Sequence, residues 1–450
     1  MRKIEIMDFK EHLYSFMDRE DADKLLSSFK NAPFSSFKAN FLKCENLIEL
    51  LENVSLKPLK HVNNAFYYDK SIDELGKDIL FYAGAYYIQE PAAMLAESLL
   101  QIKEHEKVLD MCAAPGGKSF NALLSLNNTG LLVCNDIHPI RSRILSSNIE
   151  KYGFKNTIVL NDNSTNYKKY FQLYFDKIIL DAPCSGSGMF RKDDFAIKDW
   201  SIEKVMKCKD IQLSLLEDAY EMLKGKGRLL YSTCSYSIQE NEEVIIEFLN
   251  KHSDMKLLNI ELNSLYNDSI GISGGLRLYP FKYDGEGQVM FVLEKQNDHQ
   301  INFKNKKSKN IKLDREVIKF LELINYDYKN SKVLNLRNQF FIYDFEEIDL
   351  GKINVLRYGL HLGYIENNRF IPSHSLAMVN DIDKNNFIEL TREQAIDYMQ
   401  GLTVEVNNSN KKGYAIASYK GLALGFVKQV NNTLKNHLPK GLRVSKNLVK

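Results

Sequence analysis

Two cysteines follow short apolar runs in segments that are typical of exposed turns. Cys184 lies in Asp181-Ala-Pro-Cys-Ser-Gly-Ser-Gly-Met189, and Cys234 lies in Tyr231-Ser-Thr-Cys-Ser235. An isolated cysteine is most often a small buried hydrophobic residue. These two instead follow the end of an expected strand, where exposed loop residues commonly carry function. A thiolate is a strong nucleophile, so the pair predicts covalent catalysis.

A second segment is typical of a site for a nucleotide-like cofactor. It lies between an apolar run and a helical stretch. Small residues let a ligand approach the backbone closely, and the start of the helix offers free N–H groups. The predicted cofactor contacts in this loop are Cys112, Ala113, Ala114, Pro115, Gly116, Gly117 and Lys118.

Three aspartates end successive apolar runs and extend the predicted cofactor site. Asp136 follows Gly116 by 20 residues, a spacing at which a carboxylate can accept both ribose hydroxyls. Asp162 is suited to receive an adenine amino group, and Asp181 ends the next run. A single aspartate at such a place is often only a helix cap. Several on successive strand ends indicate a ligand, because ligands bind at the carboxyl edge of a parallel sheet.

The elements that must position these residues alternate between strand and helix. Strands are expected at 107–111, 131–136, 157–162, 175–181 and 227–232. Helices are expected from the glycine-containing turn to about residue 126 and at 140–152, 213–223 and 242–249. This alternation predicts an α/β fold with a doubly wound, mostly parallel sheet. In the usual strand order, the strands that precede Cys184 and Cys234 are neighbours. A further strand at 289–293 is expected to close the sheet as its edge.

Changes in pattern divide the chain into four parts. Residues 1–100 are expected to be a mixed, mostly helical entry domain, and residues 101–297 the catalytic domain. Residues 298–312 are polar and basic, which is typical of a linker. Residues 313–450 are expected to form a separate α+β region.

Charge is distributed unevenly along the 450 residues. The net charge is +2, but residues 406–450 contain nine Lys or Arg and no Asp or Glu. Such a basic end is either a solvated tail or the contact for an anionic partner, most often nucleic acid. Apolar residues such as Tyr414, Leu424 and Phe426 favour a folded unit.

Composition also excludes several classes of protein. The six cysteines form no C-x-x-C pair, which argues against a zinc ribbon or a disulfide scaffold and favours a reducing cytoplasm. Cys44, Cys134 and Cys208 fall within expected elements and should pack in the core. No run of 18 apolar residues predicts a membrane span. We expect a cytoplasmic monomer with no metal and no membrane partner.

Two cofactors fit parts of the glycine-containing loop. Gly117-Lys-Ser119 matches the end of a P-loop, and Lys177–Asp181 resembles the metal-holding strand of an ATPase. A P-loop, however, requires glycine at position 112, where this chain has Cys112. The dinucleotide pattern G-x-G-x-x-G is also absent. The remaining candidate is S-adenosylmethionine, which carries no phosphate and requires only a small-residue turn and a ribose acid.

Two thiols beside a methyl donor suit one kind of chemistry. Carbon 5 of cytosine or uracil becomes nucleophilic when a thiolate adds to carbon 6, and a base must then remove the carbon-5 proton. Asp181 can hold the base edge. Lys118 can either support that edge or pair with Asp181. The residues alone do not decide whether Cys184 or Cys234 attacks.

The motifs resemble those of the RsmB/NOP2/Sun superfamily of RNA cytosine-C5 methyltransferases. The resemblance rests on Cys112–Lys118, Asp181-Ala-Pro-Cys184 and Ser232-Thr-Cys-Ser235, with Gly84–Pro91 before them. Further segments resemble the RsmF branch, which modifies small-subunit ribosomal RNA and has a PUA-like RNA-binding C-terminus. These are Gly188–Asp193, Gly359–Gly363, Phe370–His374, Gly421–Gly425 and Leu434–Arg443.

The resemblance implies a set of roles. Cys234 would be the nucleophile and Cys184 would assist release of the product, while residues 112–118, Asp136, Asp162 and Asp181 would contact S-adenosylmethionine. The implied substrate is 16S ribosomal RNA or the small ribosomal subunit. Residues 1–100 are then expected to bind RNA, and residues 313–450 to select it. Deleting residues 313–450 is expected to lower RNA affinity far more than cofactor affinity. The chain departs from the usual pattern at Lys38-Ala-Asn40, Phe281 and Gln288, so substrate contacts there are expected to differ. Arg141 is expected either to reach the cofactor or to form a salt bridge.

A second function class is a non-catalytic, RNA-binding factor for ribosome assembly that retains a methyltransferase fold. It predicts loss of a catalytic cysteine or of the ribose acid. Cys184, Cys234 and Asp136 are all present, which favours the enzyme.

Overall fold

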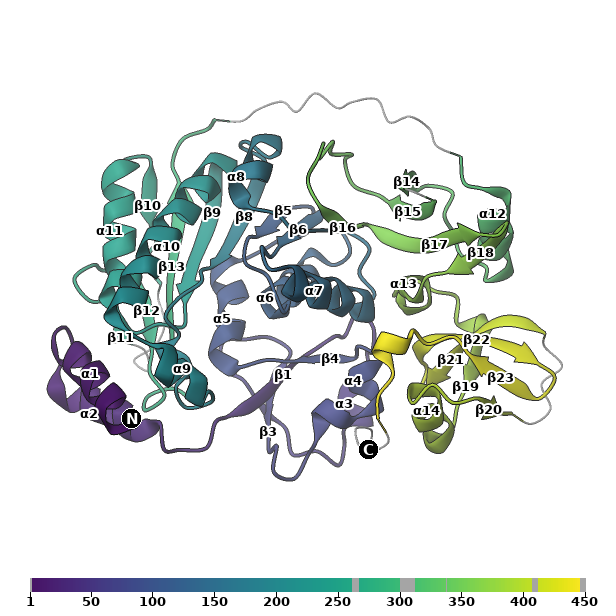
Figure 1. The fold of residues 1–450 in the computed structure, drawn as a ribbon, viewed down its shortest axis with the longest axis horizontal. Coiled ribbons are helices and arrows are strands. Elements are labelled where there is room, and N and C mark those ends of the chain that lie inside the picture. The colour runs from purple at the N-terminus through teal and green to yellow at the C-terminus, as the bar shows by residue number, and fades with distance from the viewer. Residues whose placement is uncertain (1, 261–266, 300–311, 337, 407–411, 446–450) are drawn as a thin grey trace.

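A ten-stranded sheet occupies the middle of the computed structural model, which describes residues 2–260, 267–299, 312–336, 338–406 and 412–445 (Figure 1). Its parallel core consists of β5 (Lys107–Asp110), β6 (Leu131–Asn135), β7 (Thr157–Leu160), β8 (Phe175–Asp181) and β9 (Leu223–Thr233). These strands lie in the order β7-β6-β5-β8-β9, which is doubly wound around β5. The predicted α/β fold class is confirmed.

Antiparallel strands extend the sheet beyond β9. They are β10 (Met255–Leu257), β11 (Asn267–Asp268), β12 (Leu276–Leu278) and β13 (Gln288–Lys295). The prediction that the strand at 289–293 lies at the edge is wrong. β13 pairs with β9 on one side and with β10 and β12 on the other. Its residues from Gln288 to Leu293 are all buried, as expected of a strand inside a covered sheet.

Helices cover both faces of this sheet. On one face lie α5 (Pro91–Leu100), α6 (Gly117–Leu126) and α7 (Pro139–Tyr152), which pack with Val108, Leu132 and Leu230. On the other lie α10 (Ile202–Met222) and α11 (Glu242–Lys251), with Leu109 and Leu229. The short helices α8 (Ser164–Tyr167) and α9 (Asp194–Asp199) follow β7 and β8. Each fully buried Leu or Ile contributes about 1.5–3 kcal/mol.

The N-terminal part is less helical than expected. Its helices are α1 (Arg2–Tyr14), α2 (Arg19–Ser28), α3 (Leu47–Leu50) and α4 (Ile79–Tyr82). Between α2 and α5 lies an antiparallel sheet of β2 (Lys57–Pro58), β3 (Ala65–Tyr68), β1 (Ser35–Ala39) and β4 (Tyr86–Ile88). The ring of Phe37 in β1 contacts Phe66 and Tyr86 on the neighbouring strands. Cross-strand aromatic pairs of this kind stabilise a sheet. The prediction of a mostly helical N-terminal part did not take these aromatic residues into account.

The hairpin of α1 and α2 packs against the segments that follow β8 and β9. The ring centroid of Phe9 lies 4.8 Å from that of Phe190 and 5.0 Å from that of Trp200. His12 Nε2 lies 3.0 Å from Ser237 Oγ. The hairpin therefore supports the loops that contain the two predicted catalytic cysteines.

The C-terminal part contains two smaller sheets, shown at the right of Figure 1. The first comprises β14 (Lys332–Leu336), β15 (Gln339–Tyr343), β17 (Leu360–Glu366) and β18 (Arg369–Pro372), with α12 (Arg315–Leu323). The second comprises β19 (Phe387–Glu389), β21 (Gly413–Tyr419), β22 (Leu422–Val430), β23 (Thr433–Asn436) and β20 (Val404–Glu405), with α14 (Arg392–Met399). Between the sheets, α13 (His374–Met378) contributes to a core that contains residues of both.

One C-terminal strand belongs to the central sheet. β16 (Val355–Tyr358) pairs antiparallel with β7 and forms the sheet edge there. Arg357 Nη1 lies 3.6 Å from Glu150 Oε2 on α7, and Arg357 Nη2 donates to Ser375 Oγ at 2.6 Å. Most of the predicted linker, residues 298–312, lies outside the described residues. Among the described residues, none of the helices has the length and apolar character needed to cross a membrane.

A buried ion pair joins α11 to β12. Arg277 Nη2 lies 2.5 Å from Glu242 Oε2, with both side chains 2% exposed or less. Arg277 Nη1 also donates to the carbonyl of Tyr236 at 2.9 Å, in the loop that contains Cys234.

We expect Arg277→Leu to lower the free energy of unfolding by about 3–5 kcal/mol, because it leaves Glu242 buried without a partner. Urea unfolding followed by the fluorescence of Trp200, the single tryptophan, measures this loss. The double variant Arg277→Leu/Glu242→Leu is expected to recover part of the stability. An unchanged unfolding midpoint in the single variant would contradict a structural role for the pair.

Candidate active site

The structure brings the two predicted catalytic thiols together. β8 and β9 are parallel neighbours, and Asp181 at the end of β8 is in register with Ser232 near the end of β9. Each strand then leads into a cysteine loop, which we define as residues 182–189 (the Cys184 loop) and 234–237 (the Cys234 loop). Cys184 Sγ and Cys234 Sγ lie 3.2 Å apart, and both residues are half-buried. Two thiols at this distance can act on one bound base.

Backbone contacts hold the two cysteine loops against each other. The N–H of Gly188 donates to the carbonyl of Cys234 at 2.7 Å, and the N–H of Tyr236 donates to Ser187 Oγ at 2.9 Å. A Cβ at position 188 would lie 2.7 Å from the Cys234 carbonyl oxygen, so only glycine fits there.

Asp181 is surrounded by donors beside the thiols. Lys118 Nζ lies 2.7 Å from Asp181 Oδ2, and Ser232 Oγ donates to Asp181 Oδ1 at 2.7 Å. Gln288 Nε2 lies 3.4 Å from the same oxygen. Burial opposes the charge of Lys118, but the Asp181 carboxylate outweighs it and the pKa of Lys118 is raised. Of the two roles that the sequence left open for Lys118, the structure contains the pairing with Asp181.

The predicted cofactor loop connects β5 to α6. Gly116 has φ of +114°, a backbone conformation that favours glycine, and α6 begins at Gly117. A Cβ at Gly117 would lie 2.8 Å from Gln89 Nε2, so the loop passes close to the segment before α5. The N–H of Ala113 donates to the carbonyl of Asn135 at 2.8 Å, which fixes the loop beside β6. Pro115 is exposed, whereas Ala114 is buried.

Cys112 lies at the start of this loop rather than beside the other two thiols. Burial and the nearby carboxylates raise the pKa of the Cys112 thiol well above its usual range. The thiols that lie next to each other are those of Cys184 and Cys234, whereas Cys112 belongs to the cofactor loop.

Asp136 follows β6 and lies beside the cofactor loop. Its side chain is buried and accepts the N–H of His138 at 2.9 Å. Arg141 Nη2 lies 3.4 Å from Asp136 Oδ2 and donates to the carbonyl of Ala114 at 2.7 Å. Arg141 thus forms the predicted salt bridge and also links Asp136 to the loop.

Asp162 follows β7 and is half-buried at the same edge of the sheet. Its carboxylate accepts the N–H of Asn163 at 2.8 Å and Asn166 Nδ2 at 2.7 Å. The N–H of Asn354, which directly precedes β16, lies 3.4 Å from Asp162 Oδ2. A residue from the C-terminal part therefore reaches a predicted cofactor contact, and no feature of the sequence pointed to it.

Sequence reasoning also missed two residues near the cofactor loop. Asp110, at the end of β5, is buried and accepts Ser119 Oγ at 2.7 Å, and burial raises its pKa to about 7. Ile137 is apolar but 65% exposed, directly after Asp136. Asp110 could have been identified as an acid at the end of an expected strand, and Ile137 as an isoleucine next to the predicted ribose contact Asp136.

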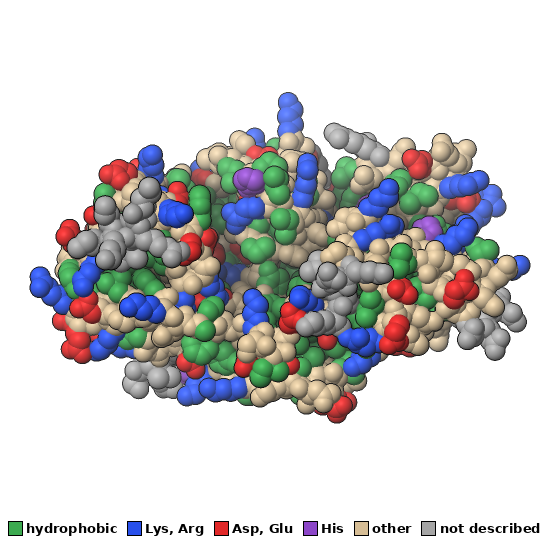
Figure 2. Space-filling view, turned by 60° about the horizontal axis from the view of Figure 1, so that its bottom comes forward, with side chains coloured by type: hydrophobic (Ala, Val, Ile, Leu, Met, Phe, Trp, Pro, Cys, Tyr) green, Lys and Arg blue, Asp and Glu red, His purple; other side chains and the backbone are tan. Residues whose placement is uncertain are grey.

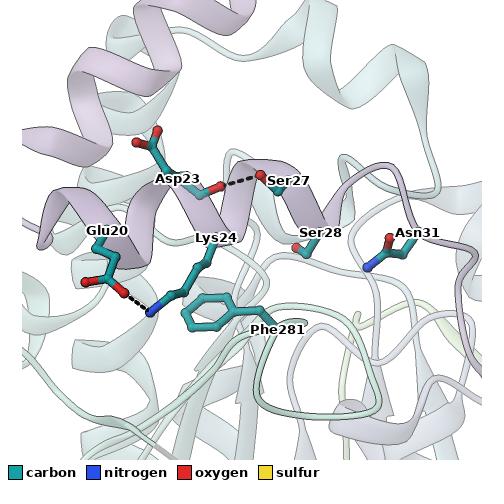
Figure 3. Close-up of a pocket in the computed structure, with 7 residues that line it drawn as sticks. All are labelled: Glu20, Asp23, Lys24, Ser27, Ser28, Asn31 and Phe281. Atoms are coloured by element: carbon teal, nitrogen blue, oxygen red, sulfur yellow. Dashed lines mark hydrogen bonds and ion pairs between the residues drawn. The ribbon is translucent and has the colours of Figure 1, made fainter.

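One surface pocket lies away from these residues, on α2 (Figure 3). Its lining residues are Glu20, Asp23, Lys24, Ser27, Ser28, Asn31 and Phe281. Figure 3 shows the Phe281 ring beside Lys24, which pairs with Glu20 at 2.6 Å. Phe281 is also stacked on Tyr279, with ring centroids 5.4 Å apart. The unusual residue at position 281 therefore lies against the N-terminal hairpin.

The other cysteines and possible metal ligands do not form a second site among the described residues. Cys44, Cys134 and Cys208 are buried. In the described ranges, no cluster of three or more His, Cys, Asp or Glu side chains could hold a metal ion.

Four models of known protein families match successive parts of the chain. Residues 97–294 match the 16S rRNA methyltransferase RsmB/F, and residues 7–91 match the N-terminal domain of 16S rRNA methyltransferase RsmF. Residues 319–379 match the first C-terminal domain of the RsmF rRNA methyltransferase, and residues 385–444 match the methyltransferase RsmF PUA domain.

Curated relatives are similar over nearly the whole chain. A protein of Shewanella piezotolerans named ribosomal RNA small subunit methyltransferase F is 31% identical, over 97% of this chain and 96% of its own. A protein of the same name from Vibrio parahaemolyticus is 30% identical, over 92% of both chains.

Solved structures share the fold of the larger part of the molecule. A methyltransferase homologue from Pyrococcus horikoshii is 29% identical with a TM-score of 0.54, and covers 62% of this chain and 91% of its own. NSun6 from the same organism is 20% identical with a TM-score of 0.56, covers 65% and 98% of the two chains, and shows the fold alone. Together with the relatives that match nearly end to end, these findings confirm the resemblance seen in the motifs, and the chain belongs to the RsmB/RsmF family of 16S ribosomal RNA methyltransferases.

Proposed function

We propose that this protein transfers a methyl group from S-adenosylmethionine to carbon 5 of a cytosine in 16S ribosomal RNA. The observation that carries the proposal is the pair of thiols, Cys184 Sγ and Cys234 Sγ, 3.2 Å apart beside the cofactor loop. Methyl transfer to carbon 5 of a pyrimidine needs a nucleophile that adds to the ring first, and a thiol can supply it. The family and its named relatives support ribosomal RNA as the substrate.

The residues around the loop suit S-adenosylmethionine. The cofactor supplies an electrophilic methyl group on a sulfonium. The buried carboxylate of Asp136 is suited to accept ribose hydroxyls, and the half-buried Asp162 is suited to an adenine amino group. The exposed apolar side chain of Ile137 provides a surface for the adenine ring. The small residues from Cys112 to Gly117 leave the backbone free for the methionine part, and Lys118 joins them to Asp181.

The chain's own groups can perform the remaining steps. In the proposed mechanism, Cys234 attacks carbon 6 of the cytosine as a thiolate, which makes carbon 5 nucleophilic. Carbon 5 would take the methyl group from the sulfonium, which would leave as a neutral thioether. Cys184 then assists removal of the carbon-5 proton, and the electron pair of that bond re-forms the double bond between carbons 5 and 6 and expels the Cys234 thiolate. The roles of the two cysteines follow the family resemblance.

Asp181 and Lys118 are suited to hold the target base. The Asp181 carboxylate can accept the amino group of cytosine, and Lys118 can stabilise charge on the ring while the thiol is attached. The ion pair at 2.7 Å keeps both groups in place before the base arrives. The base must leave its stack to reach them.

Single substitutions of the two thiols test the covalent mechanism. Cys184→Ala, mixed with unmodified 16S RNA and S-adenosylmethionine, is expected to retain a covalent RNA adduct on a denaturing gel, because release of Cys234 from carbon 6 is blocked. Cys234→Ala is expected to form no adduct and to lose methyl transfer by roughly 10⁴-fold or more. Cys44→Ala, a buried cysteine of the N-terminal part, is the control and should behave as wild type.

An adduct in Cys234→Ala alone would reverse the roles of the two thiols. No adduct in either variant, together with no methyl transfer by wild type on naked RNA or on assembled subunits, would contradict the proposed reaction and favour a purely RNA-binding function.

Basic and aromatic residues of the C-terminal part support RNA binding. Tyr414, Lys428 and Lys435 are directly paired across β21, β22 and β23. Lys428 and Lys435 are exposed, and neither forms an ion pair with a carboxylate in the described part of the chain. Like charges directly opposite each other destabilise a sheet. A bound anion such as a phosphate would offset the repulsion between Lys428 and Lys435, so this pair supports an anionic ligand. Lys428 Nζ also lies 5.7 Å from the Tyr414 ring centroid.

The distribution of basic side chains on the surface supports an extended contact with RNA. Figure 2 shows Lys and Arg side chains on the C-terminal part, at the right, and around the hollowed middle of the molecule. We propose that residues 1–100 and 313–450 select and hold the RNA, and that residues 101–297 carry out the chemistry. Because β16 pairs with β7, deleting the whole C-terminal region would also disturb the catalytic sheet. Point substitutions test this division better.

The double variant Lys428→Ala/Lys435→Ala is expected to weaken RNA binding and to reduce the slope of log affinity against log salt by about 1.5, since two phosphate contacts are lost. Calorimetry should find unchanged affinity for S-adenosylmethionine. Lys319→Ala on α12 is the control, because Lys319 is exposed but paired with Glu316 at 2.6 Å. An unchanged salt slope would exclude these lysines from the RNA contact.

A further inference from the structure

Glu240 is a fully buried carboxylate that hydrogen bonds join to both cysteine loops. It ends the short helix η4 (Ile238–Glu240), and none of its surface is exposed. Its Oε1 accepts the N–H of Ser185 at 2.7 Å, and its Oε2 accepts the hydroxyls of Ser185 and Ser235, each at 2.5 Å. Gln212 Nε2 lies 3.4 Å from Oε1. The two serine hydroxyls are 3.1 Å apart.

The position of the two serines makes these bonds significant. Ser185 directly follows Cys184, and Ser235 directly follows Cys234. The pairing of β8 with β9 ends before the thiols, with the N–H of Ala182 donating to the carbonyl of Ser232 at 2.8 Å. Beyond that point the strands no longer determine how far apart the two cysteines lie. The contacts of Gly188 with Cys234 and of Tyr236 with Ser187 hold the loops together, and the bonds to Glu240 add a constraint on the residue directly after each cysteine.

Because Glu240 is buried, its carboxylate depends on the hydrogen bonds from the two cysteine loops. A buried carboxylate is costly unless hydrogen bonds replace its water, and Glu240 forms no ion pair with a Lys or Arg of the described residues. Burial raises its pKa, and the bonds from Ser185 and Ser235 oppose that shift. If the two loops moved apart, the carboxylate would lose donors that water cannot easily supply.

We propose that Glu240 is a positioning residue that sets the separation of the Cys184 and Cys234 thiols by holding Ser185 and Ser235 on one carboxylate. This inference deepens the proposed function, since both thiols must reach one base. A displacement of about 1 Å can slow a reaction by about 10²-fold. The proposed role of Glu240 is indirect, because its carboxylate holds the two serines and the serines place the thiols.

If Glu240 acted only through its charge on Cys184, removing that charge would speed disulfide formation, whereas loss of positioning would slow it. The groups that face Cys184 are Cys234, Glu240 and Asp181, the last paired with Lys118, and Lys204 Nζ lies 3.5 Å from the carbonyl of Ser185. The hydrogen bond with Cys234, burial, and the charges of Glu240 and Asp181 raise the pKa of Cys184. Removing the charge of Glu240 would lower that pKa, increase the thiolate fraction and speed reactions of the thiol.

Disulfide trapping measures the separation of the thiols directly. Diamide oxidises two nearby thiols to a disulfide, and both hydrogens pass to its azo group to give the hydrazine. Peptide mapping by mass spectrometry follows formation of the Cys184–Cys234 link in wild type, Glu240→Gln, Glu240→Ala and the control Glu247→Gln. Glu247 is on α11 and its side chain is 59% exposed. Urea unfolding and affinity for S-adenosylmethionine report whether each variant is folded.

We expect Glu240→Ala to form the disulfide about tenfold more slowly than wild type, with cofactor affinity nearly unchanged. Glu240→Gln should lie between the two, because only one atom of its amide is an acceptor, and its N–H₂ group must face either the N–H of Ser185 or the hydroxyls of Ser185 and Ser235. If Glu240→Ala does not fold, Glu240→Gln alone carries the test. Cross-linking at the wild-type rate, or faster, in a folded variant would overturn the proposal.

The trapping experiment does not depend on methyl transfer. If the protein failed to methylate cytosine but Glu240→Gln still slowed cross-linking, the proposed function would fail and the positioning role would stand. In active enzyme, the same variant is expected to lower the single-turnover rate by about 10²-fold while the KM for S-adenosylmethionine stays unchanged.

Discussion

The parallel register between β8 and β9 is the constraint on which the site depends. It aligns Asp181 with Ser232, so that the two loops leave the sheet side by side and their thiols lie 3.2 Å apart. Because parallel strands end at the same edge, the cofactor loop after β5 and the acids after β6 and β7 lie at that edge too. A shift of one residue between β8 and β9 would move Ser232 away from Asp181 and separate the thiols.

Buried polar groups maintain that register beyond the strands. Glu240 joins the two cysteine loops, and the pair of Glu242 and Arg277 holds the carbonyl of Tyr236. A second buried pair, Arg191 and Glu286 at 2.9 Å, lies behind the Cys184 loop. Buried charges of this kind contribute little net stability when compared with well-packed apolar residues, and their benefit is a defined geometry. Their concentration around the thiols is therefore consistent with a site whose distances must be exact.

The parallel core of the central sheet and the loops that follow its strands could be predicted from the sequence. Short apolar strands, glycine-containing turns and acids at strand ends are all local signals. Cys184, Cys234 and Asp181 could thus be placed at one edge before any contact was known. Features that depend on distant pairing were not predictable: the N-terminal sheet, the inner position of β13, and β16 with Asn354 at Asp162. Glu240 escaped notice because a glutamate just before a helix is usually an exposed helix-terminal residue. Its burial becomes visible only when both loops are in place.

The most direct test of the account uses RNA that carries tritium at carbon 5 of its cytosines. Methylation at that carbon must expel its hydrogen, whereas methylation at a ring nitrogen, the amino group or the ribose leaves it in place. Methylation at carbon 5 is expected to release one tritium to water for each methyl group that wild type transfers from S-adenosylmethionine to 16S RNA. Methyl transfer without release of tritium would contradict the assignment of these thiols to carbon-5 chemistry.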